Sequence, residues 1–161
     1  MATKFSKETY LYWYELMQLI RQFELMAEEK YKMEGKIRGF FHSYVGQEAI
    51  AAGCMTATRP DDIFITSYRD HGLAIAKGVS VDSCMAELYG KATGCAKGKG
   101  GSMHFFGKNE NFFGGHGIVL FIQIDPKKHL ESYLAIEKYL ADNYKVISDP
   151  SCKDTSRLRF V

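Results

Sequence analysis

The stretch "ITSYRDHG", Ile65 to Gly72, places a tyrosine, an arginine, an aspartate, a histidine and a glycine in unbroken succession. An apolar run that starts at Ile63 leads into it, which indicates the end of a buried strand that opens into a loop. Proteins of the α/β class place ligand-handling groups at such strand ends. The stretch therefore suggests a ligand-handling site where a strand ends, as is usual in α/β proteins.

The segment before this strand is expected to be helical. Ser6 to Glu34 contains no glycine or proline, and its apolar residues recur every three or four positions, which predicts one long amphipathic helix. Ser6 is placed to cap this helix and Gly35 to end it. The wide aromatic stripe is typical of core packing, with a subunit interface as the alternative. The stripe consists of Tyr10, Trp13, Met17 and Ile20, with Leu16 and Phe23 beside them.

Two further helices are expected around the strand. A helix rich in small residues is predicted from Gly46 to the turn at Pro60. "VDSCMAELYG" predicts a short helix with Met85, Leu88 and Tyr89 facing inward and Gly90 just past its end.

The next segment is a long glycine-rich loop. All 15 glycines of the chain lie between Gly35 and Gly117. From Gly90 on they are interleaved with His, Met, Phe and Lys, which favours a binding surface over a spacer. The loop fits neither the Walker A pattern nor the dinucleotide fingerprint. What remains is a generic anion site, built from exposed backbone N–H groups with Lys97 and Lys99.

Histidines and an arginine suggest where a ligand binds. His42, His71, His104 and His116 lie in the glycine-rich half at spacings that match no zinc pattern, so a polar pocket is favoured over a metal site. The guanidinium of Arg69 suits phosphate or carboxylate, and the hydroxyl of Tyr68 can add a hydrogen bond. The alternative is a surface ion pair between Arg69 and Asp70 or another carboxylate, and both interpretations stay open.

Composition excludes several classes of function. The chain has 161 residues, 46% of them hydrophobic, which is enough for one domain with a core. A formal charge of +2 gives no reason to expect nucleic acid or an anionic membrane as partner. No apolar run is long enough to cross a membrane, and the charged N-terminus is not typical of a signal peptide. The scattered cysteines favour a reducing, cytoplasmic setting.

Four segments together resemble one family. They are "GFFHSYVGQEA" (Gly39 to Ala49), "YRDHG" (Tyr68 to Gly72), "MAELYGKATGCAKGKGGSMHFF" (Met85 to Phe106) and "FFGGHGIV" (Phe112 to Val119). In order and spacing they resemble the α subunit of the thiamine-diphosphate-dependent 2-oxo acid dehydrogenases, with the pyruvate dehydrogenase E1 component as the best match. Acetoin dehydrogenase α subunits are the alternative, since they share "MAELYGKATG" and "KGKGGSMH" but differ at "YRDHG".

The resemblance implies a cofactor site, a reaction and partners. It places the equivalent of His42 beside substrate and diphosphate, the equivalents of Tyr68 and Arg69 on the diphosphate, and the backbone around Gly117 and Val119 along the cofactor. It implies oxidative decarboxylation of a 2-oxo acid, pyruvate, and transfer of the acetyl group to lipoyl-E2. It also implies an α2β2 heterotetramer, in which the E1 β subunit supplies the glutamate that activates thiamine diphosphate.

The resemblance stops after Val119. The family continues into a glycine-rich helix and a GDG motif with a later asparagine, which together hold Mg2+, whereas this chain continues with Leu120 and contains no GDG. No metal ligands are therefore assigned. We expect residues 1–119 to be the N-terminal part of the thiamine-diphosphate-binding domain and residues 120–161 to be a divergent helical tail.

Three expectations follow from this divergence. The fold is α/β but mostly helical, with a partial parallel sheet and an added helix from Leu130 to about Asn143. The chain is expected to be a truncated or incomplete α subunit that is inactive by itself. The alternative from another class is a non-catalytic interaction module derived from the family.

Overall fold

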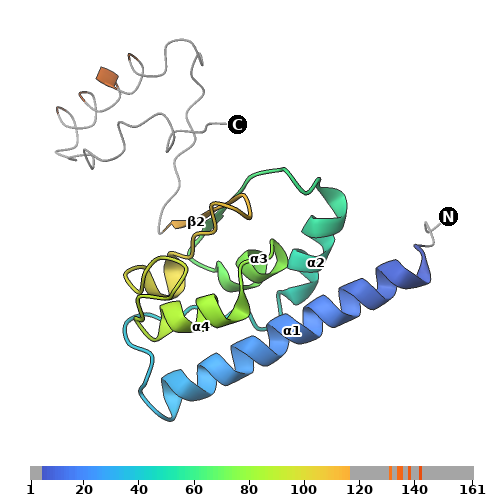
Figure 1. The fold of residues 1–161 in the computed structure, drawn as a ribbon, viewed down its shortest axis with the longest axis horizontal. Coiled ribbons are helices and arrows are strands. Elements are labelled where there is room, and N and C mark those ends of the chain that lie inside the picture. Colours follow the sequence, from blue (N-terminus) through green and yellow to red (C-terminus); the bar gives the residue numbers. More distant parts are fainter. Residues whose placement is uncertain (1–4, 117–130, 132–133, 136–137, 139–141, 143–161) are drawn as a thin grey trace. The chain divides into compact units, whose positions relative to one another are not determined.

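The structure of the chain is a computed structural model, which describes residues 5–116 and residues 131, 134, 135, 138 and 142. The chain divides into two units, Met1–Val119 and Leu120–Val161. The described residues of the second unit are helical and exposed, in agreement with a helix over this stretch. The sequence places an apolar stripe on this helix, and of its residues only Leu134 is among those described; the others are Leu130, Tyr133, Ile136 and Leu140. Figure 1 shows the order of the elements in the first unit.

The long N-terminal helix is confirmed as α1, Lys7–Lys32. The side chain of Ser6 caps it by accepting a hydrogen bond from the Thr9 N–H at 3.2 Å, and Gly35 follows its end with a φ of 60°. Its buried face carries Leu16, Ile20, Phe23, Glu24 and Ala27. The expected stripe was wrong at its start, because Tyr10 is 49% exposed. The buried residues of α1 thus run from Leu16 to Ala27, in the middle of the helix.

The small-residue helix is confirmed as α2, Glu48–Ala57. It packs against α1, and the buried side chains Ala51 and Ala52 let the two helices approach closely. The indole N–H of Trp13 donates to the hydroxyl of Thr56 at 2.6 Å, which ties the N-terminal half of α1 to the end of α2.

Two parallel strands form the sheet of the described part. Strand β1, Phe64–Ser67, pairs with β2, Phe112–His116, with Phe64 opposite Phe112 and Ser67 opposite His116. Between the strands the chain forms α3, His71–Ala76, then α4, Val81–Leu88, and a short 3-10 turn. The expected strand at Ile63 is therefore confirmed with a shift toward the C-terminus. The helices and the parallel pair confirm the α/β class.

Helix α4 turns the expected side chains toward the core and also buries Cys84 and Glu87. Cys84, Glu87 and Leu88 are buried, whereas Met85 and Tyr89 are only half-buried. The prediction that Met85 and Tyr89 face inward is confirmed, because both pack against the hydrophobic core. The helix ends at Leu88 as expected, and Gly90 follows with a φ of 66°.

Two findings bear on the setting of the protein. Of the helices within the described residues, none is long and apolar enough to cross a membrane. Cys54, Cys84 and Cys95 are free thiols.

Candidate functional site

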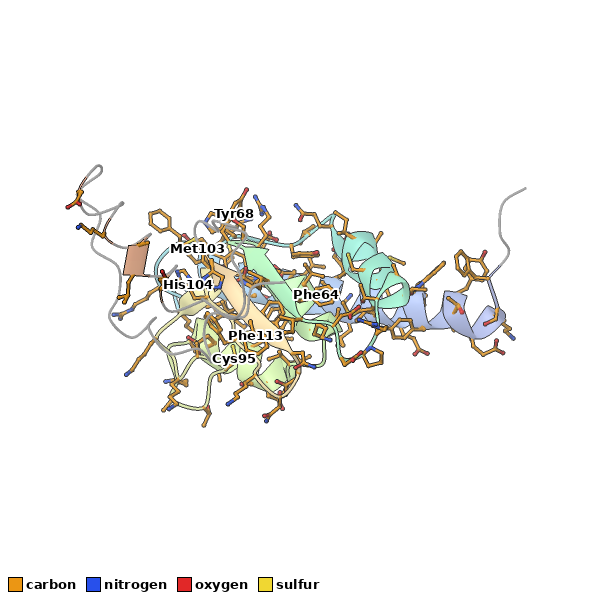
Figure 2. All side chains as sticks on the ribbon, turned by 90° about the horizontal axis from the view of Figure 1, so that it is seen from above. Phe64, Tyr68, Cys95, Met103, His104 and Phe113 are labelled. Carbon is orange, nitrogen blue, oxygen red and sulfur yellow. The ribbon has the colours of Figure 1, made fainter. Side chains whose placement is uncertain are left out.

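The first polar cluster lies at the carboxyl end of the sheet, and we call His42, Tyr68 and Arg69 the outer cluster. Tyr68 directly follows β1, and its N–H donates to the His116 carbonyl at the end of β2 at 3.0 Å. Because the strands are parallel, the carboxyl ends of β1 and β2 lie at the same edge of the sheet. This is the edge where α/β proteins place ligands. Figure 2 shows Tyr68 at this end, near Met103 and His104, and Phe64 at the other end.

The three side chains of the outer cluster lie together. The His42 and Tyr68 rings meet edge to face with centroids 5.1 Å apart, and the guanidinium carbon of Arg69 lies 5.7 Å from the Tyr68 ring. Tyr68 is 42% exposed and holds a left-handed φ of 42°, a strained conformation of the kind that gathers at functional sites. The structure thus brings together three of the expected site residues. Gly117 and Val119 lie outside the described residues.

Among the described residues, Arg69 is held by a backbone carbonyl and not by a carboxylate. One of its terminal nitrogens donates to the Ser43 carbonyl, and no carboxylate among the described residues pairs with it. The carboxylate of Asp70 instead accepts from the Thr66 hydroxyl at 3.0 Å and from the Phe105 N–H at 3.3 Å. The alternative of a surface ion pair between Arg69 and Asp70 was therefore wrong.

A second polar cluster lies inside the protein, and we call Glu24, His71 and Ser102 the inner network. Glu24 and His71 are fully buried, and Ser102 is buried too. The Nδ1 of His71 donates to Glu24 at 2.6 Å, since a carboxylate only accepts, and Nε2 lies 2.9 Å from the Ser102 hydroxyl oxygen. His71 begins α3 in the interior, so the expectation that it lines a polar pocket was wrong.

The inner network supports the loop that carries the outer cluster. The hydroxyl of Ser102 accepts from the His42 N–H at 2.9 Å, and the second carboxylate oxygen of Glu24 accepts from the Tyr44 N–H at 3.1 Å. Together with the Arg69 bond to Ser43, these contacts fix three consecutive backbone groups. Side chains of both clusters thus hydrogen-bond to the backbone of residues 42–44.

Asp70 lies between the clusters. Burial raises its pKa to about 6, although the hydrogen bonds from Thr66 and Phe105 act in the opposite direction. A Cβ at Gly115 would lie 1.5 Å from its carboxylate, so only a glycine in β2 admits this side chain. The close approach explains one of the glycines in "FFGGHGIV".

The glycine-rich loop encloses a carboxylate of the chain itself. Glu87 is buried and accepts four backbone hydrogen bonds of 2.7 to 3.1 Å. The donors are the N–H groups of Ala96, Gly98, Gly100 and Gly101. The expectation that exposed N–H groups of this loop hold an external anion was therefore wrong for these four groups, because Glu87 occupies them.

The two remaining histidines of the glycine-rich half bond to the backbone. His104 Nδ1 lies 3.0 Å from the Gly115 carbonyl oxygen, and His116 Nε2 lies 3.2 Å from the Phe113 carbonyl oxygen. In the part of the chain that the structure describes, no three His, Cys, Asp or Glu side chains are grouped to hold a metal ion. Of these four histidines, His42 is the one whose ring meets the Tyr68 ring, whereas His116 contacts Tyr68 through its backbone carbonyl.

Sequence comparison identifies the family. Residues 15–129 match the family described as dehydrogenase E1 component. The chain belongs to this family. The match extends past Val119, where the resemblance was expected to stop, to residue 129. All residues of the outer cluster and of the inner network lie within the segment that matches this family.

Curated relatives in the E1 family include pyruvate dehydrogenase α subunits. The chain is 53% identical to the pyruvate dehydrogenase E1 component subunit alpha of Rhizobium meliloti over 116 residues, which cover 72% of this chain and 33% of the relative. It is 51% identical to the testis-specific mitochondrial form of Rattus norvegicus over 118 residues, 73% and 29% of the two chains. The chain thus spans about a third of the length of these relatives.

Proposed function

We propose that this chain supplies the α-subunit side of a thiamine diphosphate site in a pyruvate dehydrogenase E1 component. The observation that supports it most is the outer cluster, because His42, Tyr68 and Arg69 converge at the carboxyl end of a parallel strand. The names of the curated relatives favour pyruvate as the substrate class.

The side chains of the outer cluster fit a diphosphate. A guanidinium has five N–H donors, and Arg69 uses one terminal nitrogen on the Ser43 carbonyl, so further donors stay free for phosphate oxygens. The Tyr68 hydroxyl makes no hydrogen bond to any described residue. The described residues do not fit Mg2+, because the carboxylate of Asp70 is buried and already engaged by Thr66 and Phe105.

Each residue has a role in this proposal. Thiamine diphosphate, when bound, supplies the carbon nucleophile through which a 2-oxo acid loses CO2. Arg69 and Tyr68 bind and orient the diphosphate, and His42 faces the substrate. Ser102 positions His42 through its backbone N–H. The backbone at Gly117 and Val119 completes the cofactor lining.

The proposal includes partners that complete the reaction. An E1 β subunit in an α2β2 assembly supplies the activating glutamate, and the lipoyl group of E2 accepts the acetyl group. Since the sequence contains no GDG motif to hold Mg2+ against the diphosphate, we propose that the chain alone does not decarboxylate pyruvate.

Calorimetric titration tests cofactor binding. Thiamine diphosphate with Mg2+ is added to the chain, with and without an E1 β subunit, and heat is expected only where the site is completed. Arg69→Gln should weaken binding by about tenfold or more, since a bond to a charged phosphate is lost. Tyr68→Phe, which removes only the hydroxyl, should weaken it less. The matched control is Arg59→Gln, because Arg59 is exposed and pairs with Asp62.

An activity assay separates the remaining alternatives. Pyruvate and acetoin are compared as substrates of the chain with the β subunit, the cofactor and Mg2+. Turnover by the chain alone would contradict its proposed inactivity. Turnover of acetoin in preference to pyruvate would assign the chain to the acetoin dehydrogenases.

The second candidate is a non-catalytic interaction module. It is favoured by apolar side chains exposed on α1, among them Tyr14 at 59% and Met26 at 53% exposure, with Met33 at 81% just past its end. A β subunit that co-elutes with the chain without any heat of cofactor binding would support this candidate over the first.

A further inference from the structure

A group of basic side chains lines a separate pocket of about 700 Å³. Lys36 and Arg38 reach it from the segment after α1, Lys91 from the segment after α4, and Lys99 from the glycine-rich loop. Figure 1 shows these three segments close to one another at the C-terminal end of α1. No residue of the outer cluster lines this pocket.

Most of this positive charge is not neutralised by the described residues. Lys36 pairs with Glu34, but Arg38, Lys91 and Lys99 have no acidic partner in the part of the chain that the structure describes. All three are exposed. Their gathering at one pocket is a local feature, since the whole chain carries a formal charge of only +2.

The one acidic residue that lines the pocket is engaged elsewhere. Glu87 accepts two backbone N–H groups on each carboxylate oxygen, so its lone pairs are directed into the glycine-rich loop. It lowers the net positive charge of the lining, but it does not tie up a lysine or arginine side chain. Arg38, Lys91 and Lys99 therefore keep donors that no described residue uses and that a ligand can take.

The backbone that carries the cations is held in place. A Cβ on Gly98 would lie 2.5 Å from the carbonyl carbon of Gly90, so these two glycines are in close contact and bring the neighbouring Lys91 and Lys99 to one side of the pocket. The bonds to Glu87 hold the loop in this position. A site whose backbone is already ordered loses less entropy on binding.

We propose that this pocket binds a small polyanion that carries at least two phosphate or carboxylate groups. Its volume lies within the range of small-molecule sites, about 300 to 1,000 Å³. Arg38 offers a planar fork for one such group, while Lys91 and Lys99 act as point charges for a second. Three cations from three segments exceed what a single carboxylate needs, which favours a ligand with two or more anionic groups.

Titration of inorganic pyrophosphate into the full chain tests the proposal. Calorimetry without Mg2+ at low ionic strength is expected to give saturable binding. The double variant K91Q/K99Q should weaken it by about tenfold or more, and K91R/K99R should keep it within about threefold. The control K7Q/K108Q removes the same charge from exposed lysines that do not line the pocket, and it should have little effect.

Two results would overturn the proposal. If K7Q/K108Q weakens binding as much as K91Q/K99Q, the interaction reflects total charge and no pocket is involved. If Arg69→Gln abolishes binding while K91Q/K99Q leaves it intact, pyrophosphate binds at the outer cluster, which would support the proposed cofactor site instead. Failure to saturate at millimolar pyrophosphate would also reject the pocket. Circular dichroism of each variant shows that it is folded.

Discussion

The outer cluster and the inner network are built from neighbouring residues but differ in what their side chains leave free. Tyr68 and Arg69 keep side-chain donors that no described residue uses, whereas the side chains of Asp70 and His71, the next two residues, are buried and each makes two hydrogen bonds. No buried side-chain nitrogen or oxygen in the described residues lacks a partner. Polar residues of one short motif can therefore serve opposite purposes. The free donors are those that we propose bind a ligand, and the satisfied groups hold the backbone in place.

The largest effect is expected from breaking the inner network at its centre. His71→Ala leaves the Glu24 carboxylate buried without its charge-assisted bond and opens a cavity, so the free energy of unfolding should fall by about 3 to 5 kcal/mol. Urea unfolding followed by circular dichroism measures this loss. Tyr68→Phe in the outer cluster is the comparison and should change stability by less than about 0.5 kcal/mol. Equal losses of unfolding free energy in His71→Ala and Tyr68→Phe would refute the distinction between a structural inner network and an outer cluster that does not stabilise the fold.

The buried carboxylate of the glycine-rich loop gives the next effect. Glu87→Gln replaces one acceptor oxygen with an amide that faces two N–H donors, so we expect a loss of about 2 to 3 kcal/mol. Hydrogen exchange at Gly98 and Gly100 should accelerate most. Glu110→Gln serves as the control, because the half-buried Glu110 side chain bonds no described residue. Unchanged amide hydrogen exchange in Glu87→Gln would show that the glycine-rich loop keeps its structure without the Glu87 carboxylate.

Asp70 makes stability depend on pH. Its pKa is about 6 in the folded protein against 3.8 as the ordinary value, so between these values the folded state holds a proton that the unfolded state has lost. Stability from this group is thus largest below pH 3.8 and falls as the pH rises to about 6, by roughly 1 to 3 kcal/mol. In Asp70→Asn the free energy of unfolding should no longer fall between pH 3.8 and about 6 because of this residue. Denaturant titrations of both proteins at several pH values measure it, and identical slopes would contradict the assignment.

The smallest effect on stability is expected at the strained residue of the outer cluster. Tyr68→Gly removes the backbone strain of a left-handed φ of 42°, which stabilises the folded state, but it also raises the conformational entropy of the unfolded chain. The two contributions to the free energy of unfolding should nearly cancel, within about 1 kcal/mol. Binding of thiamine diphosphate in the completed complex should nevertheless weaken by about tenfold or more. A large loss of stability together with intact binding would show that Tyr68 is a structural residue.

The elements that sequence alone located are those fixed by local chemistry. The helix after Ser6 follows from a cap, a periodic stripe and the absence of breakers, all within one segment. Arg69 was singled out because its chemistry is apparent without a partner. The parallel pairing of β1 and β2 was expected only through the family resemblance.

The parts that escaped prediction depend on distant partners. Glu24 interrupts an apolar stripe, which is a signal of a buried charge, but its partner His71 is 47 residues away. Nothing local marks Ser102 as a hydrogen-bond partner of His71. The glycine-rich loop showed an excess of N–H donors, yet the acceptor that fills them lies on α4. Such pairings are decided by the fold as a whole.

The parallel pairing of β1 with β2 also sets when the protein can acquire its site. Phe64 and Phe112 are partners across a long intervening segment, so their contact forms only after loop closure over that whole distance. During synthesis, Tyr68 leaves the ribosome well before His116, whose carbonyl accepts its N–H. The edge of the sheet that carries the outer cluster is therefore expected to be among the last parts of this unit to become ordered in a newly made chain.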